Sequence, residues 1–321
     1  MAAPPQPSPS EEAATEVPKV LYVMGAGRSG STILGVTLGN CERVVFAGEL
    51  DKWPLRKGVP KLEGEQIERF WSQVLARVDG AQELFAMRTH RYLERSSALL
   101  RPRRWLRARA MRARYRAVNE ALYRAIAEVA GASHVVDTGH YPLRARELQA
   151  LDGIELYLLL LVRDPRGVVA SFARTDAAER RFGTLTTNLY LWLTHLLSVA
   201  TFLRQPRERR LLVRHEDFLA RPEEVLGTIL AQTHASPELP DLGKLRVGVP
   251  LMGNRLINAE VVSLERGARP AHSGGGSASG RQGGRNSSSG SGMTALLTSV
   301  MQAPWTLVFS LLGPRARSAA A

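Results

Sequence analysis

The chain of 321 residues is 44% hydrophobic and 23% charged, which is typical of a soluble globular protein and excludes a disordered or fibrous one. Its 43 lysines and arginines outnumber 30 acidic residues, and the net charge of +13 points to an anionic ligand, substrate or surface. The single cysteine, Cys41, excludes an internal disulfide and a cysteine-based zinc site. The sequence shows neither an apolar run of membrane-spanning length nor a secretory signal, so we expect a cytoplasmic protein.

From residue 19 onward, short apolar runs alternate with stretches of helical spacing. This alternation predicts an α/β fold with a central, mostly parallel sheet flanked by helices. The run at 154–162 is almost continuously apolar, as expected for a strand buried on both faces of such a sheet. The predicted strands are 19–24, 44–46, 134–137, 154–162 and 210–214, and the predicted helices are 31–40, 62–78, 82–130, 143–151, 183–204 and 221–233.

The two ends of the chain differ in composition from the middle. Residues 1–18 predict a disordered tail, and the α/β domain is expected to cover 19–266. Glycine and serine dominate 267–292 without periodicity, which is typical of a flexible segment. We interpret 293–321 as a helix that returns to the core, followed by a tail, with a helix on a membrane surface as the alternative.

Arginine is concentrated in the stretch 88–116, which holds 11 arginines in 29 positions. Such a stretch suits a polyanionic substrate, nucleic acid or lipid head groups, whereas a solvated helix face is the purely structural interpretation. No aromatic stacking platform or nucleic-acid-binding motif accompanies it, so we expect no nucleic-acid partner. A weak contact with a membrane surface stays open as an alternative.

Residues 25–32 read Gly-Ala-Gly-Arg-Ser-Gly-Ser-Thr, between the first predicted strand and a helix. The spacing is that of a phosphate loop, except that Ser31 stands where nucleoside triphosphatases carry a lysine, which suits a shorter anion. Backbone N–H groups of such a loop and the helix N-terminus bind anions, and Arg28 adds a full positive charge. The predicted binding residues are Gly27, Arg28, Ser29, Gly30, Ser31 and Thr32.

A second candidate anchor for an anion lies in the sequence LVRDPRGVVASF. Arg163 ends the apolar run, and Ser171 follows eight residues later, about two turns into a predicted helix that Asp164 and Pro165 open. Ligands of open parallel sheets gather at the carboxyl ends of the strands. We therefore expect Arg163 and Ser171 to share one phosphate.

Together, GAGRSGST and VRDPRGVVASF resemble the two cofactor signatures of the sulfotransferase family, which uses 3′-phosphoadenylyl sulfate (PAPS). LLVRHEDF followed by RPEEVL is similar to a further family segment, and the resemblance covers about residues 19–260. It implies a P-loop-type nucleotide-binding fold and sulfuryl transfer to a hydroxyl of a small molecule or carbohydrate, without a metal ion. It also implies that the loop holds the 5′-phosphosulfate, and that Arg163 and Ser171 hold the 3′-phosphate.

The resemblance also implies three catalytic residues, Glu49, His140 and Arg28. The pair Gly48-Glu49 matches the bacterial and the carbohydrate or tyrosyl-protein branches, in the last of which this glutamate serves as the base. His140, in VVDTGHYPLRA, stands where a lysine usually contacts the sulfuryl group, and is the rival base. Arg28 would stabilise charge on the leaving phosphate.

One departure from the family pattern lies in Gly253-Asn254-Arg255-Leu256-Ile257. Many relatives carry a Gly-Asn-Pro-x-Arg-Phe-like segment that closes over the cofactor, and here Ile257 takes the place of its arginine. Arg255 is a candidate substitute for that arginine. The departure suggests a looser closure over the cofactor.

Two other functions stay open. Asp137, after a predicted strand, suits the metal carboxylate of a P-loop kinase or nucleotide hydrolase, although the missing loop lysine argues against that class. The residues at His140 and Ile257 favour a non-catalytic relative that binds PAPS or an anionic polymer. Neither the acceptor nor the oligomeric state follows from the sequence.

Overall fold

The computed structural model describes residues 17–96, 99, 103–164 and 184–264, with the backbone alone at 103–105 and 184–192. Within this part of the chain, five strands form one parallel sheet in the order β2-β3-β1-β4-β5. The predicted α/β fold with a central parallel sheet is therefore confirmed. The strands are β1 (Lys19–Gly25), β2 (Val44–Gly48), β3 (His134–His140), β4 (Glu155–Val162) and β5 (Arg210–Arg214).

Strand β3 runs to His140, three residues beyond the end predicted from its apolar run. The prediction stopped at Asp137 because the residues that follow are polar. Pairing with β1 continues nonetheless, since Met24 lies opposite His140 after a local shift of register. The strand therefore extends into the edge of the sheet at which the candidate site lies.

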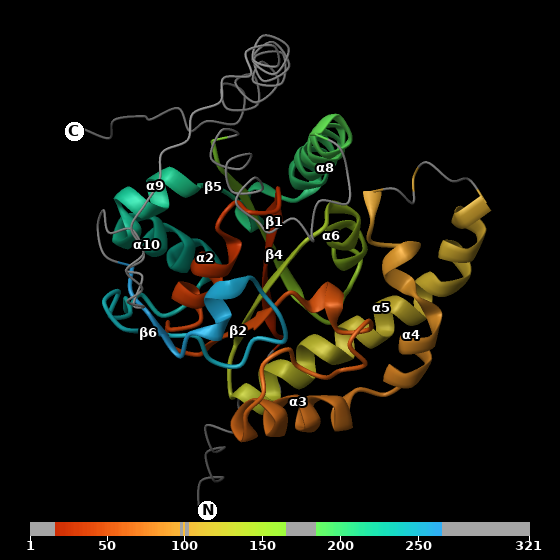
Figure 1. Ribbon diagram of the computed structural model, residues 1–321, viewed down its shortest axis with the longest axis horizontal. Coiled ribbons are helices and arrows are strands. Elements are labelled where there is room, and N and C mark those ends of the chain that lie inside the picture. The colour runs from red at the N-terminus through yellow and green to blue at the C-terminus, as the bar shows by residue number, and fades with distance from the viewer. Residues whose placement is uncertain (1–16, 97–98, 100–102, 165–183, 265–321) are drawn as a thin grey trace, which may run out of the picture.

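Helices cover both faces of the sheet, as Figure 1 shows. On one face lie α2 (Ser31–Leu38), α9 (His215–Ala220) and α10 (Pro222–Thr233), which Figure 1 draws on the left. The other face is covered by α3 (Glu65–Arg77), α4 (Ala81–Met87), α5 (Arg103–Ala130), α6 (Pro142–Leu148) and α8 (Thr184–Arg204). Short 3-10 turns are η1 (Leu50–Lys52), η2 (Thr89–Arg91), η5 (Arg207–Arg209) and η6 (Arg255–Asn258).

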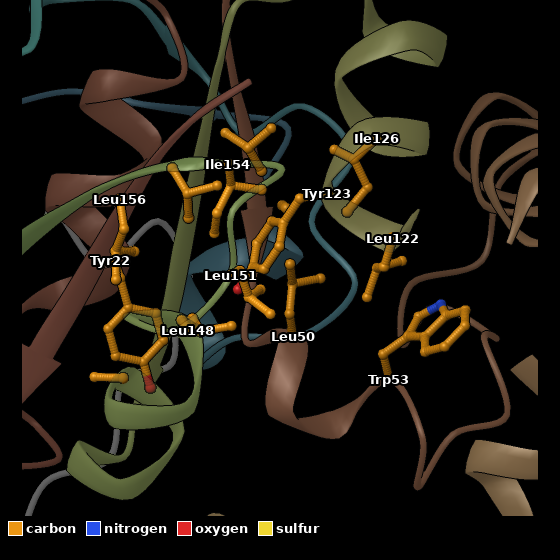
Figure 2. Close-up of a cluster of buried hydrophobic side chains, with 14 of the residues drawn as sticks. Tyr22, Leu50, Trp53, Leu122, Tyr123, Ile126, Leu148, Leu151, Ile154 and Leu156 are labelled. Atoms are coloured by element: carbon orange, nitrogen blue, oxygen red, sulfur yellow. The ribbon is translucent and has the colours of Figure 1, made fainter. Parts of the chain in front are cut away.

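The central strands send alternate side chains into two separate cores. In β4, Leu158 and Leu160 pack with α3 to α6, whereas Leu159 and Leu161 pack with α2, α9 and α10. This alternation explains why 154–162 is almost continuously apolar, because a strand between two helix layers has no wet face. Figure 2 shows the first core, where Tyr22 of β1, Trp53 and side chains of α5 and α6 come together.

A short antiparallel pair, β6 (Leu245–Arg246) and β7 (Val261–Val262), follows the main sheet in the chain. Among the described residues, no helix combines the length and hydropathy needed to cross a membrane. Several predictions lie outside the described residues: the tail over 1–16, the helix expected after Asp164, the Gly/Ser-rich segment 267–292 and the C-terminal segment 293–321.

Candidate active site

The glycine-rich loop connects β1 to α2 in a conformation that exposes backbone N–H groups. Arg28 and Gly30 both have positive φ, 68° and 93°, so the chain turns sharply before the helix begins at Ser31. No side chain caps the N-terminus of α2, so its first N–H groups have no partner from a capping residue. The Ser29 hydroxyl donates to the carbonyl of Ala26, 2.6 Å away, and so stabilises the turn itself.

Arg163, the first residue after β4, joins the second predicted anchor to this loop. Its Nη1 donates to the backbone carbonyl of Arg28, 2.9 Å away. The two sequence motifs therefore meet at the carboxyl edge of the neighbouring strands β1 and β4. Ser171, the other predicted residue of that anchor, lies outside the described residues.

His215 lies directly against the loop, although the sequence analysis did not single it out. A Cβ built at Gly30 would lie 2.4 Å from His215 Nδ1, so a glycine is required there for space as well as for its positive φ. Within the described residues, Nδ1 of this buried ring has no hydrogen-bond partner. Burial, helped by the charge of Arg163, lowers the pKa of His215 to about 4, so the ring is neutral at neutral pH.

Glu49 follows β2 at the same edge of the sheet. Its N–H donates to the carbonyl of Met252, 2.9 Å away, and a Cβ at Gly48 would lie 2.3 Å from that same oxygen. The Glu49 side chain is 18% exposed, and its Oε2 lies 4.0 Å from Nζ of Lys52, which also pairs with Asp51. Burial by itself would lower the pKa of Lys52. The nearby negative charge of Asp51 has the opposite and larger effect, so the pKa of Lys52 lies above its usual value.

His140 ends β3 with a positive φ of 44°. Its Nδ1 lies 2.8 Å from the carbonyl of Thr138. A carbonyl only accepts, so Nδ1 is the donor, and the neutral tautomer that fits this contact has Nε2 as its acceptor. This tautomer is the one that a histidine base requires, and His140 is therefore equipped for either role predicted for it.

Asp137 connects the segments that carry Glu49 and His140. Its Oδ1 accepts from the N–H of Gly139 at 2.8 Å and from the N–H of Leu50 at 3.3 Å. These donors adjoin His140 and Glu49, so one carboxylate holds both candidate bases at neighbouring positions. Lys52 Nζ also lies 5.2 Å from the ring centre of Tyr141, which confirms that η1 and the end of β3 are close.

The other oxygen of Asp137 enters a fully buried network centred on Arg144. Asp137 Oδ2 accepts from the hydroxyl of Tyr123 at 2.6 Å and from Arg144 at 3.2 Å. Arg144 also donates to Glu94 at 3.0 Å, so its charge is shared between two buried carboxylates. With both oxygens of Asp137 occupied, the structure favours an architectural role for this residue over the metal-binding role of a kinase.

A stretch far along the chain completes this edge of the sheet. Met252 contacts Glu49 through the backbone, and the next residue, Gly253, lies beside α2, since a Cβ there would be 3.5 Å from Thr32 Cγ2. Ile257 is buried in the core that the sheet forms with α2, α9 and α10. This stretch therefore lies next to the start of α2, and Ile257 fills a packing position. Arg255 is exposed.

Comparison with known proteins identifies the family. The model of the sulfotransferase family matches residues 19–236, which include the loop, Glu49, His140 and Arg163. The chain belongs to the sulfotransferase family. The family predicted from the two motifs, with its P-loop-type α/β fold, is thus confirmed.

Three solved sulfotransferase structures are similar to this chain. The sulfotransferase domain from the curacin biosynthetic pathway is 15% identical, with 78% of this chain and 86% of that chain covered and a TM-score of 0.45. The sulfotransferase from Alicyclobacillus acidocaldarius is 15% identical, and the match covers 70% of this chain and 84% of that chain with a TM-score of 0.38. Sulfotransferase STF1 from Mycobacterium tuberculosis is 13% identical, and the match covers 71% of this chain and 73% of that chain with a TM-score of 0.44. A search of curated proteins found no match.

The predicted residues thus lie in two groups at one edge of the sheet. Arg28, Gly30 and Arg163 lie at the ends of β1 and β4, and Glu49 and His140 lie at the ends of β2 and β3. The described residues contain no group of three or more histidine, cysteine or carboxylate side chains placed to hold a metal ion. The sequence did not reveal the positions of His215 and Met252 beside these residues, or the role of Asp137 in connecting them, because each depends on contacts with residues distant in the sequence.

Proposed function

We propose that this sulfotransferase moves the sulfuryl group from PAPS to a hydroxyl of a small-molecule or carbohydrate acceptor. The observation that carries the proposal is the contact between Arg163 Nη1 and the Arg28 carbonyl. It brings together the two motifs assigned to the 5′-phosphosulfate and the 3′-phosphate, at the edge where α/β proteins bind nucleotides. ATP, which lacks the 3′-phosphate, is then a poor ligand.

In the proposed reaction, a bond forms between the acceptor oxygen and sulfur while the bond from sulfur to the leaving phosphate oxygen breaks. Negative charge builds on that phosphate, and Arg28 with the N–H groups at the start of α2 stabilises it. The acceptor proton passes to a base at the ends of β2 and β3. Positioning and electrostatics thus supply the catalysis.

Glu49 is the proposed base. Its carboxylate is partly exposed, lies beside the Lys52 ammonium and is fixed through the backbone at Met252. His140, in its protonated form, then donates a hydrogen bond from Nε2 to an oxygen of the sulfuryl group. The alternative assignment, with His140 as the base, is consistent with its Nδ1 tautomer.

Nucleotide affinity tests the donor assignment directly. We expect 3′,5′-adenosine bisphosphate to bind about ten- to a hundredfold more tightly than 5′-AMP by calorimetry, since one charge-assisted contact contributes about 1.5–3 kcal/mol. Arg163→Gln should remove this preference, whereas Arg214→Gln, at the end of the adjacent β5, should keep it. Equal affinities of the wild-type protein for the two nucleotides would contradict the proposal.

Measurements of turnover distinguish a sulfotransferase from a P-loop kinase or hydrolase and from a non-catalytic relative. Radiolabelled PAPS with a panel of sugars, phenols, lipids and other alcohols should give a labelled product, and the transfer should survive EDTA. Strict magnesium dependence with ATP turnover would instead indicate a kinase or hydrolase. Tight nucleotide binding without transfer to any acceptor would indicate a non-catalytic relative.

A further inference from the structure

Helix α8 buries its polar side. The Ser198 hydroxyl donates to the carbonyl of Thr194 at 2.8 Å, and the Thr201 hydroxyl donates to the carbonyl of Pro142, the first residue of α6, at 3.4 Å. A helix of a globular protein ordinarily buries its apolar side instead. The apolar residues of α8 are therefore left to face outward. The buried residues of α8 whose side chains are described are Thr194, His195, Ser198, Thr201 and Phe202.

The outward side of α8 carries a row of apolar residues. Leu196 is 38% exposed and Leu203 is 49% exposed. The row advances by three, four and three residues, which is the spacing of the seam along which one helix packs against another. Figure 1 shows α8 at the outer rim of its helix layer. We call this row the α8 stripe: Leu193, Leu196, Ala200 and Leu203.

The sequence contains a segment whose pattern matches the α8 stripe. Residues 293–303 read Met-Thr-Ala-Leu-Leu-Thr-Ser-Val-Met-Gln-Ala, and Pro304 follows them. On a helix, Met293, Leu296, Val300 and Ala303 have the same spacing of three, four and three residues. The polar residues of the segment fall on the opposite side of that helix. The segment thus predicts an amphipathic helix with a seam of the same length as the α8 stripe.

The lack of charge on both partners favours a contact within the protein over a membrane surface. Neither residues 191–203 nor residues 293–303 contain a lysine, arginine, aspartate or glutamate. A helix that lies on a membrane usually carries lysine or arginine on its polar face, which these two stretches do not offer. Two uncharged apolar seams instead suit helix-on-helix packing.

The length of the chain allows the segment to reach α8. The described residues end at Leu264, and a chain as long as 265–292 spans about 90 Å when fully extended, roughly twice the width of a domain of this size. A tethered segment is also present at an effective concentration on the order of millimolar. A second copy of the protein reaches such a concentration only in very concentrated solution, so the tether favours the segment of the same chain.

We propose that residues 293–303 dock as a helix along the α8 stripe and complete the helix layer there. Docking removes the apolar seams of both helices from water, and this is the driving force for the contact. The proposal goes beyond the proposed function and is independent of it, because none of the residues involved is assigned to the donor nucleotide or to the acceptor.

Hydrogen exchange of the full-length protein, followed by mass spectrometry, tests the docking without requiring turnover. We expect the amides of 293–303 to exchange at least about tenfold more slowly than those of a free peptide of the same sequence. Val300→Glu places a charge on the apolar seam and should abolish this protection. Ser299→Glu places the same charge on the polar side of the segment and should keep it, and neither change touches the described domain.

A second pair of variants tests the location. Leu196→Glu/Leu203→Glu should also abolish the protection of 293–303, while the amides of β5 stay protected and show that the domain is folded. The matched control is Leu219→Glu/Leu239→Glu, which changes two leucines that are 41% and 43% exposed outside α8. This control should leave the protection as it is in the wild type.

Several results would overturn the inference. These are rapid exchange of 293–303 in the wild type, protection that survives in Leu196→Glu/Leu203→Glu, and equal loss in the two leucine variants. Protection that depends on protein concentration, with a dimer in sedimentation, would assign the α8 stripe to a second copy. Protection seen only with phosphatidylglycerol vesicles would assign the segment to a membrane. Affinity for 3′,5′-adenosine bisphosphate reports separately on the proposed function, and we expect all four variants to retain it.

Discussion

Strands β1 and β3 are neighbours in the sheet, and both end in turns that carry site residues, but these turns are stabilised in different ways. After β1, the Ser29 hydroxyl donates to the Ala26 carbonyl and the Arg163 side chain donates to the Arg28 carbonyl, so these two contacts use carbonyls of the loop and not its N–H groups. Near the end of β3, the Asp137 carboxylate accepts from backbone N–H groups beside Glu49 and His140 and from a buried arginine and tyrosine.

This difference matches the tasks that we propose for the two turns. A loop that binds a phosphate must leave its N–H groups free for the ligand, so the protein cannot saturate them beforehand. Catalytic groups must instead be held in place before the substrate arrives, since reorganisation during the reaction costs rate. The first prediction below tests the candidate bases at the ends of β2 and β3. The second compares the stability of the end of β3 with that of the loop, and the third tests His215, which packs against the loop.

The largest expected effect is on turnover. If Glu49 accepts the acceptor proton, Glu49→Gln should keep its affinity for 3′,5′-adenosine bisphosphate and lose about 10²- to 10⁴-fold in kcat. His140→Lys should retain activity, because a lysine can contact the sulfuryl group. Steady-state kinetics with a good acceptor measures both, and Glu63→Gln, an exposed glutamate, is the control.

The reverse pattern would assign the base to His140. His140→Lys would then be inactive at neutral pH, because an ammonium group cannot accept a proton. Glu49→Gln would lower kcat only slightly. Near-normal kcat in Glu49→Gln is the result that contradicts our assignment.

The second prediction compares the stability of the two turns. Asp137→Asn should lower the free energy of unfolding by about 3 kcal/mol, because it leaves the buried Arg144 charge with Glu94 as its remaining charged partner. Ser29→Ala, in the loop, removes one hydrogen bond and should cost about 1 kcal/mol. Urea denaturation measures both, with the exposed Asp152→Asn as the control. Equal losses in the two turns would contradict the comparison.

The third prediction concerns a pH dependence of stability that His215 causes beside the loop. His215 has a folded-state pKa of about 4, below its ordinary value of 6.5, so between these values the unfolded chain binds a proton that the folded protein does not. The stability is therefore complete above pH 6.5 and falls on acidification, by up to about 1.4 kcal/mol per pH unit. His215→Asn should have a shallower slope between these pH values than the exposed control His234→Asn. Identical slopes would show that His215 does not titrate in this way.

The sequence was informative where a local pattern reports local structure. Apolar runs located the strands of the sheet, because burial on both faces requires them, and β5 was predicted with both of its ends correct. The loop and Arg163 could also be predicted as neighbours, since the parallel strands β1 and β4 end at the same edge. The match to the sulfotransferase family model then agreed with the family that these motifs resemble.

Long-range polar packing could not be predicted. Arg144 and Glu94 look like surface residues in the sequence, yet both are fully buried, because each satisfies the other's charge. His215 was part of a recognised segment, but its contact with Gly30 depends on how β5 and α9 pack against the loop. The ion pairs of Arg112, Arg114 and Arg116 in the arginine-rich stretch likewise depend on where α4 and α6 carry their glutamates.

The backbone contact between Glu49 and Met252 also has a consequence for the order in which the protein is made. The partner of Glu49 is synthesised about two hundred residues after Glu49 itself. Until that later stretch is available, the N–H of Glu49 and the carbonyl of Ala47 lack their partners Met252 and Leu251. A chain that stops before Leu251 therefore contains the residues of all five strands of the parallel sheet but lacks both backbone contacts beside Glu49, so this edge is completed only after the strands themselves have been made.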